Sequence, residues 1–183
     1  MEKPAAELIE FSTRMRADVI RALSGAAPAN AQYERRIYAR VLFAYIEGSI
    51  YLLKRVLLKL HEMNPQIAFF TDAERSLLLE CSYEIDVRGR PQEKQIKLKT
   101  LSNIVFTLNL YDRVHSGSRG IDKGGDGWRS LSKALLIRHR ITHPKRSSDV
   151  DITDADLMNL IAADNYFHDE LKAIVFRVPA MVP

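Results

Sequence analysis

Apolar residues recur at intervals of three and four along most of the chain, the spacing of helices that bury one face. The first predicted helix stops near Gly25, and its apolar positions are Leu8, Phe11, Met15, Val19 and Leu23. A second, long helix is predicted from about Asn30 to Met63, where Asn64-Pro65 ends it. Its expected apolar face consists of Tyr33, Ile37, Val41, Ala44, Gly48, Leu52 and Val56.

The middle of the chain changes pattern twice. Thr71-Asp72-Ala73-Glu74 has the capping-box sequence and predicts a shorter helix through Cys81. Residues 83–99 alternate between apolar and polar on both sides of Gly89-Arg90-Pro91, which predicts a loop or small hairpin. A further helix is expected from about Leu101 to Val114.

The last third of the chain predicts two helices after a connector. The glycine-rich segment from Ser116 to Gly127 lacks Walker spacing, so we reject a P-loop and expect a mobile, exposed connector. One helix then begins near Trp128 and stops before Pro144. The other is capped by Thr153 and continues to about Phe176, with inward positions at Leu157, Leu160, Ile161, Phe167, Leu171 and Ile174.

The fold class expected from these elements is all-α, an up-and-down helical bundle of five to six helices with a loop or small hairpin insertion around 83–99. No internal repeat or linker separates domains, so residues 1–183 are expected to form a single helical domain.

Composition narrows the classes of function. The net charge of +4 is compatible with RNA or another polyanion and does not by itself prove one. Cys81 is the single cysteine, which excludes an internal disulfide and a cysteine-based zinc cage and favours a reducing compartment. The start leads to no secretory apolar core, and the most apolar stretch, Val41 to Leu53, is too short to span a bilayer. We therefore expect a soluble, cytoplasmic protein without membrane association.

The richest chemistry lies in Arg138-His139-Arg140-Ile141-Thr142-His143-Pro144-Lys145, directly after the apolar run Leu131 to Ile137. A guanidinium can bind phosphate and an imidazole can move a proton near neutral pH. Cations in the last turn of a helix also favour its dipole by about 0.3–1 kcal/mol each. That ordinary interpretation accounts for Arg140, Lys145 and Arg146, but it does not explain two imidazoles.

Helical geometry brings the two imidazoles together but separates Arg138 from His143. His139 and His143 are four residues apart and share a helix face. Arg138 and His143 are five apart, about 140° around an ideal helix. They converge only if the last turn loosens before Pro144 or if the arginine reaches round.

Arg138-His139-x3-His143 resembles the Arg-polar-x3-His form of the Arg-x4-6-His motif of the HEPN superfamily. The motif's position on a late helix followed by one more helix agrees with that family. The resemblance covers the chain from about Asn30 to the last helix. By this comparison, residues 1–29 are an N-terminal helical extension and 83–99 an insertion in the bundle.

The resemblance implies a metal-independent endoribonuclease without a cofactor, and a homodimer that brings two motifs into one cleft. Attack by the ribose 2′-hydroxyl would leave a 2′,3′-cyclic phosphate and a 5′-hydroxyl. Arg138 would stabilise the phosphorane, His143 would act as general acid or base, and His139 would orient the phosphate or share the proton transfer. Glu47 and Thr142 are expected to support them, and the RNA-binding cations would be Arg140, Lys145, Arg146, Arg119 and Lys123.

The family resemblance also suggests a toxin or an antiviral defence component, with an antitoxin or a nucleotidyltransferase-like protein as a possible partner. A non-catalytic HEPN-like module that binds RNA or nucleotide, or scaffolds a partner, is the main alternative. A third is a metal site at His139 and His143 with His168 or Asp169 as third ligand, which the cations Arg138 and Arg140 oppose.

Glu47, the cations of the glycine-rich segment and two aromatic residues each have two interpretations. Arg40, Glu47, Lys54 and His61 recur every seven residues and so lie on one stripe of the helix, which is typical of a solvated face. Alternatively, Glu47 faces the motif helix and pairs with Arg138. The cations of the glycine-rich segment could close on RNA or be ordinary surface charge. Trp128 and Tyr111 could stack on bases, but the interpretation we favour for both is packing.

Overall fold

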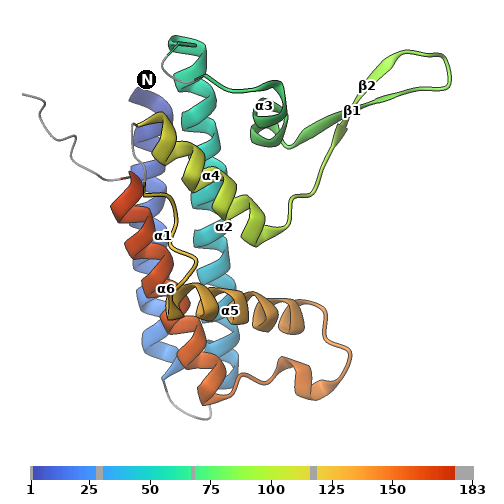
Figure 1. Ribbon diagram of the computed structural model, residues 1–183. Helices are drawn as coiled ribbons and strands as arrows, with labels where there is room; N and C mark the ends of the chain where they lie inside the picture. Colours follow the sequence, from blue (N-terminus) through green and yellow to red (C-terminus); the bar gives the residue numbers. More distant parts are fainter. Residues whose placement is uncertain (1, 28–30, 67–68, 116–118, 176–183) are drawn as a thin grey trace, which may run out of the picture.

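The computed structural model describes residues 2–27, 31–66, 69–115 and 119–175. Within these ranges the chain is an all-α helical bundle of six α-helices with one small hairpin, which confirms the predicted fold class (Figure 1). The elements in chain order are α1 (Glu2–Ala26), α2 (Gln32–Met63), α3 (Asp72–Leu79), β1 (Cys81–Ile85), β2 (Pro91–Gln95), α4 (Thr100–Val114), α5 (Asp126–Thr142), the 3-10 turn η1 (Ser147–Val150) and α6 (Asp154–Val175).

Helix α2 is the central element and contacts α1, α3, α4, α5 and α6. Its buried apolar residues therefore surround much of the helix instead of forming one stripe: Tyr38, Ala39, Leu42, Phe43, Tyr45, Ile46, Ile50, Leu52, Leu53, Val56 and Leu57. The face predicted from spacing was wrong in part, because Tyr33 is 63% exposed and Ala44 is exposed as well. Ile37, Val41 and Ala44 line a surface groove between α1 and α2.

Helices α1 and α2 approach most closely where Phe11 lies against Gly48. A Cβ built on Gly48 would be 2.2 Å from the Cζ atom of Phe11, so the aromatic ring occupies the space that any larger residue would need. Only glycine, which has no side chain, lets this ring lie directly on the helix backbone.

We expect Gly48→Ala to lower the free energy of unfolding by about 1–3 kcal/mol, because the added methyl group overpacks the α1–α2 contact. Gly25→Ala is the matched control, since its Cβ would meet only the Glu34 side chain, with Cγ at 3.4 Å and Cβ at 3.7 Å. That control gains helix propensity and should be neutral or stabilising by about 0.5–1 kcal/mol. Urea unfolding of both variants measures the difference, and equal effects would contradict the proposed crowding.

The predicted capping box is present at the start of α3. The backbone N–H of Glu74 donates to Thr71 Oγ1 at 3.2 Å, and that of Thr71 donates to Glu74 Oε2 at 2.9 Å. The predicted end of this helix at Cys81 was wrong: Glu80 adopts a left-handed conformation with φ 54°, and Cys81 begins β1. Lys54 Nζ donates to Leu77 O at 3.2 Å and to Glu80 Oε1 at 2.8 Å, which fixes the helix end against α2.

The predicted insertion at residues 83–99 is part of a hairpin, which was one of the two structures expected for it. Strands β1 and β2 pair antiparallel from Cys81–Gln95 to Ile85–Pro91. The hairpin extends away from the helices (Figure 1), so Tyr83 and Ile85 remain exposed although they alternate like core positions.

The described part of the glycine-rich segment, 119–125, is anchored to the bundle rather than forming the free connector that we expected. The backbone N–H of Gly120 donates to Asp112 Oδ2, and that of Ile121 to Asn109 Oδ1, each at 2.9 Å. Arg119 forms an ion pair with Glu170 at 2.6 Å, and Ile121 is buried. Residues 116–118 lie outside the described ranges, as does the expected end of the last helix at Phe176.

Candidate functional site

The sequence motif forms the C-terminal end of α5, which extends past α2 on the side of the hairpin (Figure 1). Ile137 and Ile141 are buried and hold the helix on the bundle. Arg138 between them is partly buried, whereas His139 and His143 are exposed. The backbone N–H of His143 still donates to His139 O at 3.0 Å, and Pro144 follows. The anchoring isoleucines thus leave the polar groups of the motif at the surface.

Glu47 of α2 meets Arg138 of α5. Arg138 Nη2 lies 3.1 Å from Glu47 Oε1, and the two side chains are 28% and 42% exposed. This agrees with the second interpretation of Glu47 and not with a purely solvated face. Ion pairs at such exposure contribute about 0–1 kcal/mol to stability, so the main consequence is orientation of the guanidinium. Its other N–H groups can still donate to a phosphate.

His139 and His143 lie next to each other at the solvent-exposed C-terminal end of α5. Their ring centroids are 6.5 Å apart with an interplanar angle of 29°. His143 has left the helical conformation, with φ −127° and ψ 61°. The regular helix therefore ends at Thr142, one residue before His143.

Two of the motif's other residues serve internal contacts. Thr142 Oγ1 donates to Arg138 O at 2.6 Å. Arg140 donates to Asp151 O at 2.7 Å and to Asp156 Oδ2 at 2.8 Å, which ties the segment after α5 to the start of α6. The guanidinium of Arg140 is thus engaged within the fold.

The five cations predicted to bind RNA divide into two groups. Arg140 and Arg119 are held by the carboxylates of Asp156 and Glu170. The remaining three, Lys123, Lys145 and Arg146, are exposed. Lys145 and Arg146 directly follow the motif, and their backbone N–H groups donate to Asp149 Oδ2 at 2.8 and 2.9 Å. The accessible positive charge nearest in sequence to the motif therefore comes from these two residues.

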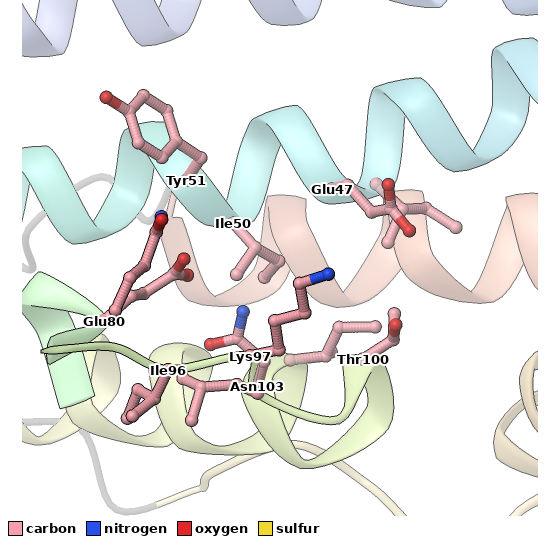
Figure 2. A pocket seen from close by; sticks show the side chains of 12 residues that line it. Glu47, Ile50, Tyr51, Glu80, Ile96, Lys97, Thr100 and Asn103 are labelled. Atoms are coloured by element: carbon pink, nitrogen blue, oxygen red, sulfur yellow. The ribbon is translucent and has the colours of Figure 1, made fainter. Parts of the chain in front are cut away.

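A cavity of about 440 Å³ lies beside Glu47, between α2, α4 and the connection that leads from β2 into α4 (Figure 2). It is lined by Ile46, Glu47, Ile50, Tyr51, Glu80, Gln95, Ile96, Lys97, Leu98, Thr100, Asn103 and Ile104. Among these, only Glu47 had been selected from the sequence. Nothing in the local pattern marks Lys97 or Asn103, because they line the same cavity as Glu47 only through the packing of α4 on α2.

Neither of the two suggested third metal ligands, His168 or Asp169, forms a metal-binding group with His139 and His143 in the described ranges. His168 Nδ1 is hydrogen bonded to the hydroxyl of Tyr45 at 3.1 Å, and burial lowers the pKa of this imidazole. Within the described ranges, no group of three or more His, Cys, Asp or Glu side chains is arranged to hold a metal ion. The geometry therefore gives the metal-site alternative no support.

No helix in the described ranges combines the length and apolarity needed to cross a bilayer. Comparisons of the chain with protein-family models, with curated proteins and with solved structures found no match.

Proposed function

We propose that this protein is a metal-independent endoribonuclease of HEPN type that acts as a homodimer. The observation that carries the proposal is the exposed end of α5, where Glu47 orients Arg138 and the rings of His139 and His143 lie side by side. A phosphate-binding guanidinium and accessible imidazoles are the groups that RNA cleavage by 2′-hydroxyl attack requires.

In this mechanism His143 removes the proton of a ribose 2′-hydroxyl, and the oxygen attacks the adjacent phosphorus. Arg138 donates hydrogen bonds to the non-bridging oxygens as negative charge grows on them. A protonated imidazole then donates its proton to the leaving 5′-oxygen, which gives a 2′,3′-cyclic phosphate and a 5′-hydroxyl. His139 orients the phosphate or shares the proton transfer.

A second copy of the chain would complete the site. Each chain offers one Arg138 and one His143, and a dimer that joins two α5 ends supplies a base and an acid from different protomers. An apolar residue of the same helix, Leu136, is 68% exposed two positions before Arg138. Such a side chain next to the motif suits a contact between copies.

A non-catalytic module that binds RNA or nucleotide is the second candidate. It is favoured by the ion pair itself, because Glu47 partly neutralises Arg138 and competes with a substrate phosphate for its donors. In that case the motif binds phosphate or scaffolds a partner without cleavage. Under the nuclease proposal, an antitoxin or nucleotidyltransferase-like partner that covers the α5 end would regulate a toxin or a defence component, whereas the non-catalytic module would scaffold such a partner.

The test incubates the purified protein with mixed RNA in EDTA and identifies the ends of the products. We expect cleavage that EDTA does not affect, cyclic phosphate ends, and no cleavage where the 2′-hydroxyl is replaced by hydrogen. His143→Ala should abolish the activity. His115→Ala is the matched control, because His115 is another exposed histidine that follows the last residue of a helix.

Several results would reject the nuclease. Cleavage that EDTA stops would point to a metal enzyme. Equal loss in His143→Ala and His115→Ala, with circular dichroism showing both variants folded, would remove His143 from the reaction. RNA binding that persists without any cleavage by the wild-type protein would favour the non-catalytic module.

A further inference from the structure

We propose that residues 81–99 form an arm that binds single-stranded RNA and guides it to Arg138. This inference rests on the proposed function, and it adds the part of the chain that would hold the strand outside the cleavage site. The arm consists of β1, the turn 86–90, β2 and the connection 96–99. The hairpin projects away from the helices, so both of its faces are open to a large ligand (Figure 1).

The arm is more basic than the rest of the chain. Its three carboxylates are outnumbered by five cations: Arg88, Arg90, Lys94, Lys97 and Lys99. The resulting net charge of +2 is half of the +4 of the whole chain, although the arm contains only 19 of the 183 residues. Positive charge concentrated on one projecting element attracts a polyanion.

Most of the carboxylates are neutralised within the hairpin itself. Lys94 Nζ pairs with Glu84 Oε2 at 2.9 Å, and Arg90 Nε pairs with Asp86 Oδ2 at 3.2 Å. The other three cations of the arm are exposed and form no ion pair within the described ranges: Arg88, Lys97 and Lys99. A phosphate that binds these three therefore displaces no carboxylate.

The turn of the hairpin is held by its own hydrogen bonds. The backbone N–H groups of Arg88 and Arg90 both donate to Asp86 Oδ1 at 2.8 Å. Gly89 adopts a φ of 74°, which lets the chain reverse at this point. The backbone of the turn thus needs no partner, and the exposed guanidinium of Arg88 is left for one.

The arm also carries exposed apolar groups beside its cations. Tyr83 and Ile85 alternate along β1 and are 64% and 77% exposed, and Val87 in the turn is fully exposed. An exposed aromatic ring can stack on an unpaired base, which favours a single strand over a duplex. Glu93, which forms no ion pair within the described ranges, lies opposite Tyr83 in the hairpin. This carboxylate repels phosphate, so the strand would place its bases on this face and its phosphates at the free cations.

The base of the arm adjoins the cleavage motif. Lys97 and Glu47 line the same cavity, and Glu47 Oε1 lies 3.1 Å from Arg138 Nη2. In Figure 2 the side chain of Lys97 extends from the connection toward α2 and Glu47. Glu80, the other carboxylate of this cavity, is paired with Lys54. A strand whose phosphate binds Arg138 can therefore continue past the Lys97 ammonium onto the hairpin.

The arm is long enough for more than one nucleotide. Strand β2 and the two residues that follow it, 91–97, span about 20 Å at roughly 3.3 Å per residue. The arm and Arg138 would therefore hold different nucleotides of one strand.

The first experiment measures how salt weakens the binding of a fluorescent 2′-O-methyl oligouridylate, an RNA analogue without the attacking hydroxyl. Each cation that binds a phosphate of a single strand contributes about 0.7 to the slope of log Kd against log salt concentration. The triple variant Arg88→Gln, Lys97→Gln, Lys99→Gln should therefore lower this slope by about 2 and weaken binding about tenfold or more at low salt.

A matched control removes the same charge from three exposed cations outside the arm: Arg21→Gln, Arg40→Gln and Lys172→Gln. None of these three forms an ion pair within the described ranges, so the control changes the net charge equally and breaks no contact of that kind. Its slope should stay close to that of the wild-type protein. Equal changes in the two triple variants, or an unchanged slope in the arm variant, would overturn the proposal.

Tyr83→Ala tests the stacking surface separately from the charge. It should weaken binding of the oligouridylate about fivefold or more and leave the salt slope unchanged, because no cation is removed. Tyr33→Ala is its matched control, since Tyr33 lies on α2 and is 63% exposed. If Tyr83→Ala instead dissociates a dimer in sedimentation and leaves the affinity for the oligouridylate unchanged, the arm is a protein interface and the proposal is overturned.

The failure of the arm and that of the nuclease can be told apart. Binding of the oligouridylate that depends on the arm, without RNA cleavage by the wild-type protein, would retain the arm and remove the nuclease. RNA cleavage that the arm variants perform with unchanged rate and affinity would retain the nuclease and remove the arm.

Discussion

Arg138→Ala is expected to lower the rate of RNA cleavage by roughly 10²–10³-fold, the usual effect of removing one donor that stabilises transition-state charge. Stability should change little, by about 1 kcal/mol or less, because the ion pair with Glu47 is half exposed. A selective loss of rate in a folded protein therefore identifies the guanidinium as part of the reaction. Single-turnover cleavage with excess enzyme measures it, and urea unfolding checks the fold.

Arg129→Ala is the matched control for this experiment. Arg129 is on the same helix, is exposed and pairs with Asp126. Its removal should leave the cleavage rate near that of the wild type. Arg138→Lys should recover only part of the activity, because an ammonium cannot bind two phosphate oxygens in the planar fork geometry of arginine. Full activity of Arg138→Ala, or equal losses in Arg138→Ala and Arg129→Ala, would contradict the proposed role.

Local sequence signals predicted the parts of the fold that local chemistry controls. Helix spacing gave the six helices, and capping patterns gave two helix starts correctly: Thr71 with Glu74, and Thr153 with Asp156. Both depend on side chains three residues apart, so no knowledge of the rest of the chain is needed. The position of the motif at a helix end followed in the same way from Pro144.

Errors arose where a distant part of the chain decides the outcome. The apolar face of α2 was misassigned because this helix has neighbours on several sides, so a single stripe cannot describe its burial. The end of α3 was placed two residues too late, since Lys54 from α2 fixes the turn at Glu80. The anchoring of the glycine-rich segment depends on Glu170, which is remote in sequence.

In the candidate site too, local sequence identified some residues, and contacts between distant parts of the chain decided the others. Arg138, His139 and His143 were predicted because they lie within six consecutive residues. The pairing of Arg138 with Glu47 was one of two open interpretations, because only the contact between α2 and α5 decides which way Glu47 faces. Asn103 was not predicted, since its place in the cavity beside Glu47 follows from the packing of α4 on α2 and not from its neighbours in sequence.

The largest stability effect is expected at Arg35, which is 2% exposed. Its guanidinium donates to Ala26 O at 3.2 Å, to Ile152 O at 2.8 Å and to Asp154 Oδ1 at 2.6 Å. One side chain thereby connects the end of α1, the start of α2 and the approach to α6. Arg35→Met keeps most of the apolar stem and removes these donors. We expect the free energy of unfolding to fall by about 2–4 kcal/mol, because the Ala26 carbonyl loses the Arg35 donor and the Ile152 carbonyl keeps only the hydrogen bond from Gln32 Nε2 at 3.1 Å.

Two control variants separate the backbone carbonyls from the ion pair. Asp154→Asn should cost less than about 1 kcal/mol, because the Asp154 side chain is 81% exposed. Arg36→Met removes the neighbouring arginine, whose hydrogen bond to Val150 O is long at 3.3 Å, and its effect should also be small. Urea unfolding of the three variants ranks them directly. If Asp154→Asn lowers the free energy of unfolding as much as Arg35→Met, the ion pair holds these segments together. If Arg35→Met alone is strongly destabilising, the hydrogen bonds to Ala26 O and Ile152 O hold them together. The motif helix α5 then depends on these bonds through its packing on α6.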